Sequence, residues 1–166
     1  MPSIFTTGLN GIGVYNDMPK TVKYFQDINI VETLRLPAQK PDIEVVSSML
    51  ISPKVISTKL INTPIALSYE GQNLSGYKLL VDLQIQEKVK YVAALPHQPV
   101  HSAHYTNINK NVFVVVPEEI DDIRICDLIR KNKYSVTPYV NDVYTLIKDC
   151  RTIYNCVSIL VDVKFF

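Results

Sequence analysis

The feature that most restricts the fold of this chain is a strict alternation of side chains in residues 77–92, YKLLVDLQIQEKVKYV. Apolar residues hold the odd positions from Leu79 to Tyr91, and most even positions are polar. Side chains two residues apart share one face of a strand, so this period predicts a long, half-buried β-strand. Glu87 breaks the apolar row, and we expect the strand to bend near it.

Other segments repeat the pattern or fit a strand by their β-branched content. The alternating ones are residues 23–37 (KYFQDINIVETLRLP, through Tyr24, Ile28, Ile30, Leu34 and Leu36) and residues 156–166 (CVSILVDVKFF). Shorter candidates are residues 54–64, ended by Pro64, and residues 111–117, ended by Pro117. Residues 41–50 fit a strand about as well as a helix.

One segment, residues 117–131 (PEEIDDIRICDLIRK), is a helix candidate. It starts with a proline and acids and ends with basic residues, as helices do, although its Ile-Arg-Ile-Cys centre also fits a strand. Its four acidic residues, Glu118, Glu119, Asp121 and Asp122, are typical of a solvated turn. We therefore predict a mainly β fold, a β-sandwich or an irregular barrel, with room for one short helix near residues 118–131.

The length of 166 residues suits one domain with an arm. We assign residues 1–20 to an N-terminal arm and residues 21–166 to a single β-rich domain. The glycines of residues 8–13, GLNGIG, do not have the dinucleotide-binding spacing, and no strand precedes them. The apolar start of the arm predicts that it binds a surface, such as that of a neighbouring subunit.

Charge and hydrophobic runs exclude several kinds of partner. The chain has 17 basic and 16 acidic residues and no basic block, so we expect no binding of nucleic acid. No apolar run reaches the roughly 18 residues that a membrane helix needs, and the N-terminus lacks a secretory signal. We expect a protein made in the cytoplasm without membrane insertion, whose low net charge favours self-association.

All three histidines, His97, His101 and His104, lie within residues 95–105, LPHQPVHSAHY. On a helix they would share a face, as zinc ligands do, but Pro96 and Pro99 prevent a regular helix. On a strand, His101 and His104 would point to opposite faces. We therefore predict no metal site and expect the imidazoles to bond backbone groups at a sheet edge or interface.

Catalytic patterns are missing from the sequence. Ser102 adjoins His101, so on a strand their side chains would diverge, and no known hydrolase motif is present. We predict no enzyme activity and no cofactor. The cysteines, Cys126, Cys150 and Cys156, number three and form no C-x-x-C pair. They are either reduced thiols, as in a cytosol, or candidates for cross-linking after assembly in a more oxidising place.

Two segments, read together, resemble the SPOCS domain, the spore coat-associated domain of endospore-forming Firmicutes. Residues 36–65 contain a leucine-proline pair, a spacer and K-P-D-I-E, followed by β-branched strands. Residues 76–105 and 113–117 are similar to a G-x-K-L-x-V strand, a K-I-x-Y-V-A stretch, a V-H-S-A-H segment and a strand ending in proline. The resemblance covers about residues 34–166. Leu83 replaces a frequent glycine, and Pro99 replaces the usual serine.

This resemblance implies a role in the spore envelope, in the coat or exosporium, and carries over no catalytic residues. We expect a structural protein, made in the mother-cell cytoplasm and deposited on the spore surface. It would assemble with itself and with other spore proteins through strand edges, tyrosine-rich faces and the arm. The alternative is a non-assembling adaptor that binds a coat morphogenetic protein or a glycan.

Overall fold

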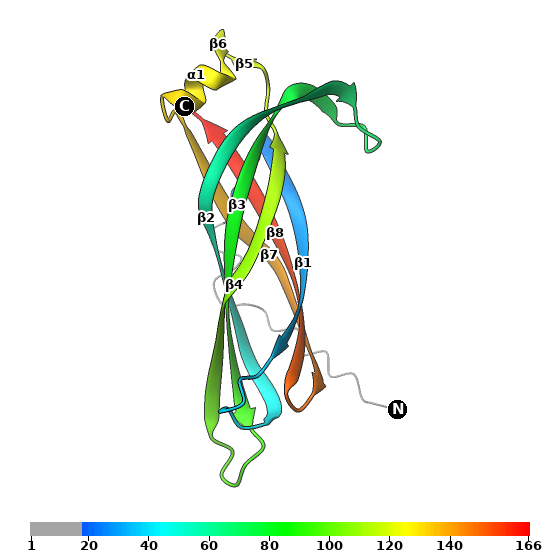
Figure 1. Cartoon of the computed structure of the whole chain (residues 1–166), viewed down its shortest axis with the longest axis vertical. Coiled ribbons are helices and arrows are strands. Elements are labelled where there is room, and N and C mark those ends of the chain that lie inside the picture. Colours follow the sequence, from blue (N-terminus) through cyan, green and yellow to red (C-terminus); the bar gives the residue numbers. More distant parts are fainter. Residues whose placement is uncertain (1–17) are drawn as a thin grey trace.

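Long antiparallel strands make up most of this chain (Figure 1). The structure, a computed structural model, describes residues 18–166. Most of the predicted arm and the GLNGIG segment lie outside the described residues. The elements are β1 (Tyr24–Arg35), β2 (Ile43–Leu67), β3 (Asn73–Ala93), β4 (Val100–Val115), β5 (Glu119–Ile120), β6 (Ile123–Arg124), α1 (Ile125–Arg130), β7 (Tyr134–Asp149) and β8 (Thr152–Phe165).

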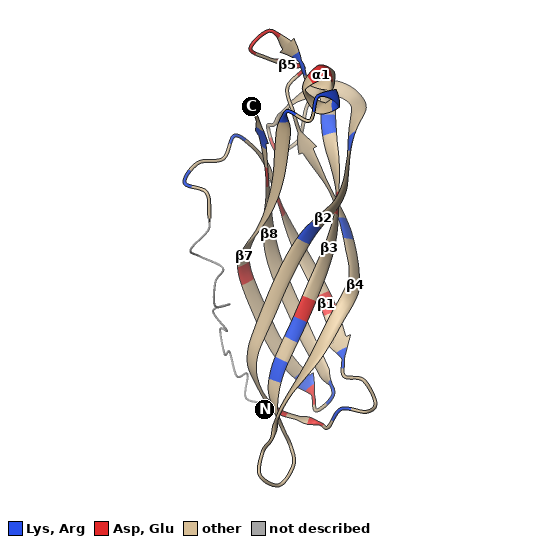
Figure 2. Cartoon of the chain, turned by 90° about the vertical axis from the view of Figure 1, so that its left-hand side faces the viewer, with Lys and Arg blue, Asp and Glu red and all other residues tan. Residues whose placement is uncertain are grey.

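The long strands form two three-stranded antiparallel sheets. Sheet A has the order β1-β8-β7, and sheet B has the order β2-β3-β4. Strand β2 lies over β7 and β1 lies over β4, so the sheets face each other as two layers (Figure 2). The sheets do not close into a barrel. The predicted mainly β fold is confirmed, and of the two predicted architectures the sandwich-like one is observed.

The core lies between the sheets and is filled mainly by alternate residues of the central strands β3 and β8. On β3, every odd position from Leu79 to Ala93 is buried, as the alternation predicted. Each fully buried Val, Leu or Ile side chain stabilises the fold by roughly 1.5–3 kcal/mol. The residues predicted to face the core from β1 do so, namely Tyr24, Ile28, Ile30, Leu34 and Leu36.

The pairing of β3 with β4 is interrupted beside Glu87. Ile85 pairs with Ile108 and Glu87 pairs with Tyr105, so Gln86 alone faces two residues of β4. Such a β-bulge bends a strand and increases its twist. It falls where the break in the apolar row predicted a bend, although Glu87 itself keeps the inward orientation of its neighbours and is buried.

The β2–β3 hairpin turns sharply near its tip (Figure 1). Gly76 has φ +94°, a conformation that L side chains rarely adopt, and it is buried. Opposite it, the β2–β3 register shifts between Asn62 and Ile65, across Pro64. The bend carries the turn at residues 68–72 over the free edges of β1 and β4.

The helix is shorter than the predicted span of residues 118–131. Asp121 and Asp122 have φ values of +50° and +63° and form the tight turn between β5 and β6, so helix α1 begins only at Ile125. Asp adopts the left-handed conformation more readily than most residues, which favours the turn. The four acidic residues are exposed, as predicted for a solvated turn. Within residues 18–166, no helix is long and apolar enough to cross a membrane.

Candidate interaction surface

The three histidines lie in different environments. His97 is in the β3–β4 loop with φ +69°. His101 pairs with the inward-facing Tyr91, whereas His104 pairs with Lys88 on the outer face of sheet B, so the predicted divergence of these two histidines is confirmed. Across residues 18–166, no three His, Cys, Asp or Glu side chains are grouped to hold a metal ion.

The segment V-H-S-A-H is a structural part of β4. Ala103 is buried in the core, and the ring of His101 stacks on Tyr91 with 6.0 Å between ring centroids. In the part of the chain that the structure describes, this stacking replaces the backbone hydrogen bond that we predicted for the imidazoles. The histidines therefore contribute to packing and to the surface of the sheet.

The cysteines are free and distant in the fold. Cys126 is in α1, Cys150 is in the β7–β8 turn, and Cys156 is on the outer face of sheet A between Val31 and Tyr144. The hydrogen bond with Asp42, followed by burial, raises the pKa of the Cys150 thiol. An activated cysteine needs the opposite shift, because the thiolate is the nucleophile.

Arg151 belongs to the β7–β8 turn, which lies at the lower end of the molecule in Figure 1. Its guanidinium donates to Asp42 Oδ1 at 2.6 Å and to the carbonyls of Lys40 and Pro37 at 3.1 and 2.8 Å. This hydrogen bond from Arg151 is the main reason that the pKa of Asp42 is lowered. The cluster ties the β7–β8 turn to the β1–β2 loop.

A buried polar group lies between the sheets. Thr145 Oγ1 donates to Asn155 Oδ1 at 2.9 Å, and Asn155 Nδ2 donates to Glu87 Oε2 at 3.0 Å. The second carboxyl oxygen of Glu87, Oε1, has no hydrogen-bond partner among the described residues. Burial raises the pKa of Glu87, with a smaller contribution from the nearby Glu32. The sequence showed Glu87 only as a break in an apolar row.

The free edges of the sheets differ in their protection. Proline and bulges blunt an edge strand against pairing with another chain. Strand β2 carries Pro53, Pro64 and four register shifts, and β7 carries Pro138 and two shifts. Strand β4 has one shift, beside Tyr105. Strand β1 contains no proline and pairs with β8 over all 12 of its residues without a shift.

Side chains from β4 cover the second half of the β1 edge. Tyr105 Oη donates to the Arg35 carbonyl at 3.1 Å, and Lys110 Nζ lies 2.7 Å from Glu32 Oε1. These contacts hold the two sheets together on this side. The first half of β1 lacks such cover from the part of the chain that the structure describes.

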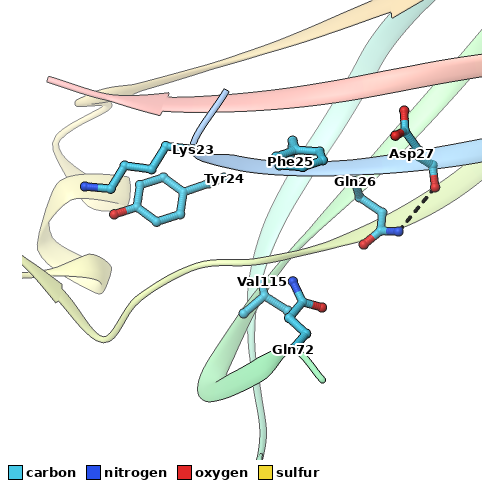
Figure 3. A pocket seen from close by; sticks show the side chains of 7 residues that line it. All are labelled: Lys23, Tyr24, Phe25, Gln26, Asp27, Gln72 and Val115. Carbon is cyan, nitrogen blue, oxygen red and sulfur yellow. Dashed lines mark hydrogen bonds between the residues drawn. The ribbon is translucent and has the colours of Figure 1, made fainter. Parts of the chain in front are cut away.

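A pocket of about 230 Å³ opens at this uncovered half (Figure 3). Its lining comes from five consecutive residues of the chain, Lys23–Asp27, and from Gln72 and Val115 on the opposite side. Gln72 belongs to the overhanging β2–β3 turn, so the bend at Gly76 builds one wall. The pocket combines three segments far apart in the sequence, which no local pattern could have identified.

The overhanging hairpin also exposes large apolar side chains, Ile65, Leu67 and Tyr69. Ile65 is 79% exposed although it is part of a strand. Within residues 18–166, most other tyrosines do not form the exposed faces that we predicted. Tyr91 donates to the Pro41 carbonyl, and Tyr134 Oη lies 2.7 Å from Thr58 Oγ1, so these rings join elements of the fold.

A second pocket of about 270 Å³ lies over the bulge on sheet B and includes Lys88 and His104. Its polar lining residues are exposed except for Glu87, which is buried between the sheets and bonded to Asn155. We therefore take the β1 edge with the overhanging hairpin as the candidate interaction surface. Comparisons with protein-family models, curated proteins and solved structures found no match to this chain.

Proposed function

We propose that this chain is a structural protein of the bacterial endospore envelope, in the coat or exosporium, that assembles with copies of itself. The spore role is supported by the resemblance of residues 34–166 to the SPOCS domain. The V-H-S-A-H segment and the β3 strand that carry this resemblance are neighbours in sheet B.

Self-assembly is supported by one observation above the others, the regular and partly uncovered edge of β1. An unprotected edge offers backbone N–H and C=O groups to a strand of another molecule. The exposed Ile65, Leu67 and Tyr69 belong to the same hairpin as Gln72, which lines the pocket at this edge, and they offer apolar area to a neighbouring molecule.

Purified full-length protein tests the assembly. We expect light scattering and electron microscopy to show particles or filaments whose amount grows with concentration. The double variant Leu67→Ser, Tyr69→Ser should assemble more weakly, because it removes apolar area without touching the core.

A clean monomer at high concentration would contradict self-assembly. It would favour the adaptor alternative, which a pull-down from sporulating cells would then examine. The variant Ser47→Ala, which changes one exposed hydroxyl at the end of β2 remote from the hairpin tip, serves as the control.

A further inference from the structure

We propose that residues 1–17 of one copy add a strand to the β1 edge of a second copy, in the pocket formed by Lys23–Asp27, Gln72 and Val115. This inference rests on the proposed self-assembly and specifies the site at which one copy holds the next.

The pocket has the lining expected of a strand acceptor. Successive side chains of a strand point to opposite faces of its sheet. Five consecutive residues, Lys23–Asp27, can therefore line the same pocket only if the pocket runs beside their backbone, at the edge of the sheet. Gln26 Nε2 donates to the Asp27 carbonyl at 3.2 Å (Figure 3). The side-chain amide of Gln26 thus donates to a backbone carbonyl that could instead accept from the backbone N–H of an added strand.

The pocket suits a chain segment better than a small molecule. At about 230 Å³ it is smaller than the roughly 300–1,000 Å³ of most ligand pockets, and it is open to solvent. Five of its seven lining residues follow one another in the chain, and the turn at residues 68–72 supplies the opposite wall through Gln72.

The N-terminal residues have a suitable composition for the occupant. Residues 1–16 contain no Asp, Glu, Lys or Arg, and Ile4, Phe5, Thr6 and Thr7 are residues that favour strands. The 17 residues outside the described structure can span roughly 55–60 Å when extended. That length is enough to reach an adjacent molecule.

A second copy is the better donor than the chain's own arm. Figure 2 shows the residues that lead into β1 on the outer side of sheet A, away from sheet B, which supplies Gln72 and Val115. To enter its own pocket, the arm would have to reverse within residues 18–22, which include Pro19. The arm of a neighbour has no such restriction.

Photo-cross-linking of the full-length chain tests this proposal. The photoreactive residue p-benzoylphenylalanine replaces Phe5, and heavy-isotope-labelled and unlabelled chains are mixed before irradiation. We expect mass spectrometry to find cross-links between a labelled and an unlabelled chain, at residues 23–27, 72 or 115. The same probe in place of Leu95, an exposed residue of the β3–β4 loop at the opposite end of sheet B, should not reach these residues.

A pocket-filling variant provides the matched control. Gln72→Trp should lower the yield of these cross-links about tenfold, which corresponds to roughly 1.4 kcal/mol of binding. Glu70→Trp adds the same ring to the same turn outside the pocket lining and should leave the yield unchanged.

The outcomes separate this inference from the proposed function. Cross-links within one chain, or none at the pocket while particles still form, would overturn the arm site and leave self-assembly standing. Cross-links between chains without ordered particles would support the arm site and count against a structural role.

Discussion

Glu87 is a carboxyl group held between two sheets with one oxygen unpartnered among the described residues. Ionising it there costs free energy, because the buried charge loses its hydration and meets only one hydrogen-bond donor, Asn155. The raised pKa of Glu87 expresses this cost. Its polar contacts to β8 join the central strands of the two sheets.

We predict that Glu87→Gln stabilises the protein at neutral pH. The folded state binds the Glu87 proton more tightly than the unfolded state, whose ordinary pKa is 4.5. The free energy of unfolding of the wild type therefore falls as pH rises from about 4.5 to the raised pKa of Glu87, by at most about 1.4 kcal/mol per pH unit. At pH values above that pKa, the lost stability is not regained. A glutamine side chain keeps an oxygen that can accept the hydrogen bond from Asn155, and it has no proton to lose as pH rises.

Urea denaturation of both proteins across this pH range is the measurement. The two should agree below pH 4.5 and diverge above it. Glu119→Gln, at an exposed carboxylate in the acidic turn, should leave the pH profile unchanged. A Gln variant that is less stable than the wild type at neutral pH would show that the ionised form is favoured in the fold.

At the scale of elements, period-2 alternation predicted β1, β3 and β8, because one face of each packs into the core, although Leu160 and Asp162 on the other face of β8 are buried as well. The length of β2 could not be predicted, since Pro53 and Pro64 read as strand ends. An edge strand tolerates them because only one side is paired. The candidate pocket could not be predicted either. It requires the strand order and the bend at Gly76, which depend on contacts between distant segments.

The bend itself yields a prediction about glycine. Gly76→Ala should lower the free energy of unfolding by about 1–3 kcal/mol, because φ +94° strains an L residue and the new Cβ would lie 3.0 Å from Ile65 Cγ1. Gly71→Ala, at φ +84° with nothing within 4 Å, carries the backbone cost alone.

Urea denaturation midpoints compare the two alanine variants. Gly76→Ala should be the less stable. Equal losses would show that the backbone conformation, and not the contact with Ile65, is what requires glycine at position 76.

At the scale of the whole molecule, the three cysteines lie in three separate parts of the fold. Cys126 lies near the end that carries α1, Cys150 lies at the opposite end, and Cys156 lies on the outer face of sheet A (Figure 1). Disulfides formed by the folded protein would therefore join separate copies.

We predict that assembled protein exposed to an oxidant gives a ladder of oligomers on denaturing gels, and that reductant collapses the ladder to a monomer. Replacing all three cysteines by serine should abolish the ladder. The raised pKa of the Cys150 thiol lowers its thiolate fraction, so Cys150 should react more slowly than its exposure alone would suggest. Identical monomer bands with and without reductant would rule out cross-linking of the assembled form.

The pocket at the β1 edge and the segment proposed to fill it belong to different parts of the same chain. A two-fold pair in which each copy fills the pocket of the other satisfies both contacts in a closed dimer, as in domain swapping. Copies that instead pass the segment on in one direction return to the first molecule as a closed ring or continue as a filament. Such a filament would have one terminus with a vacant acceptor and another with an unused donor, and growth could be stopped at either one separately.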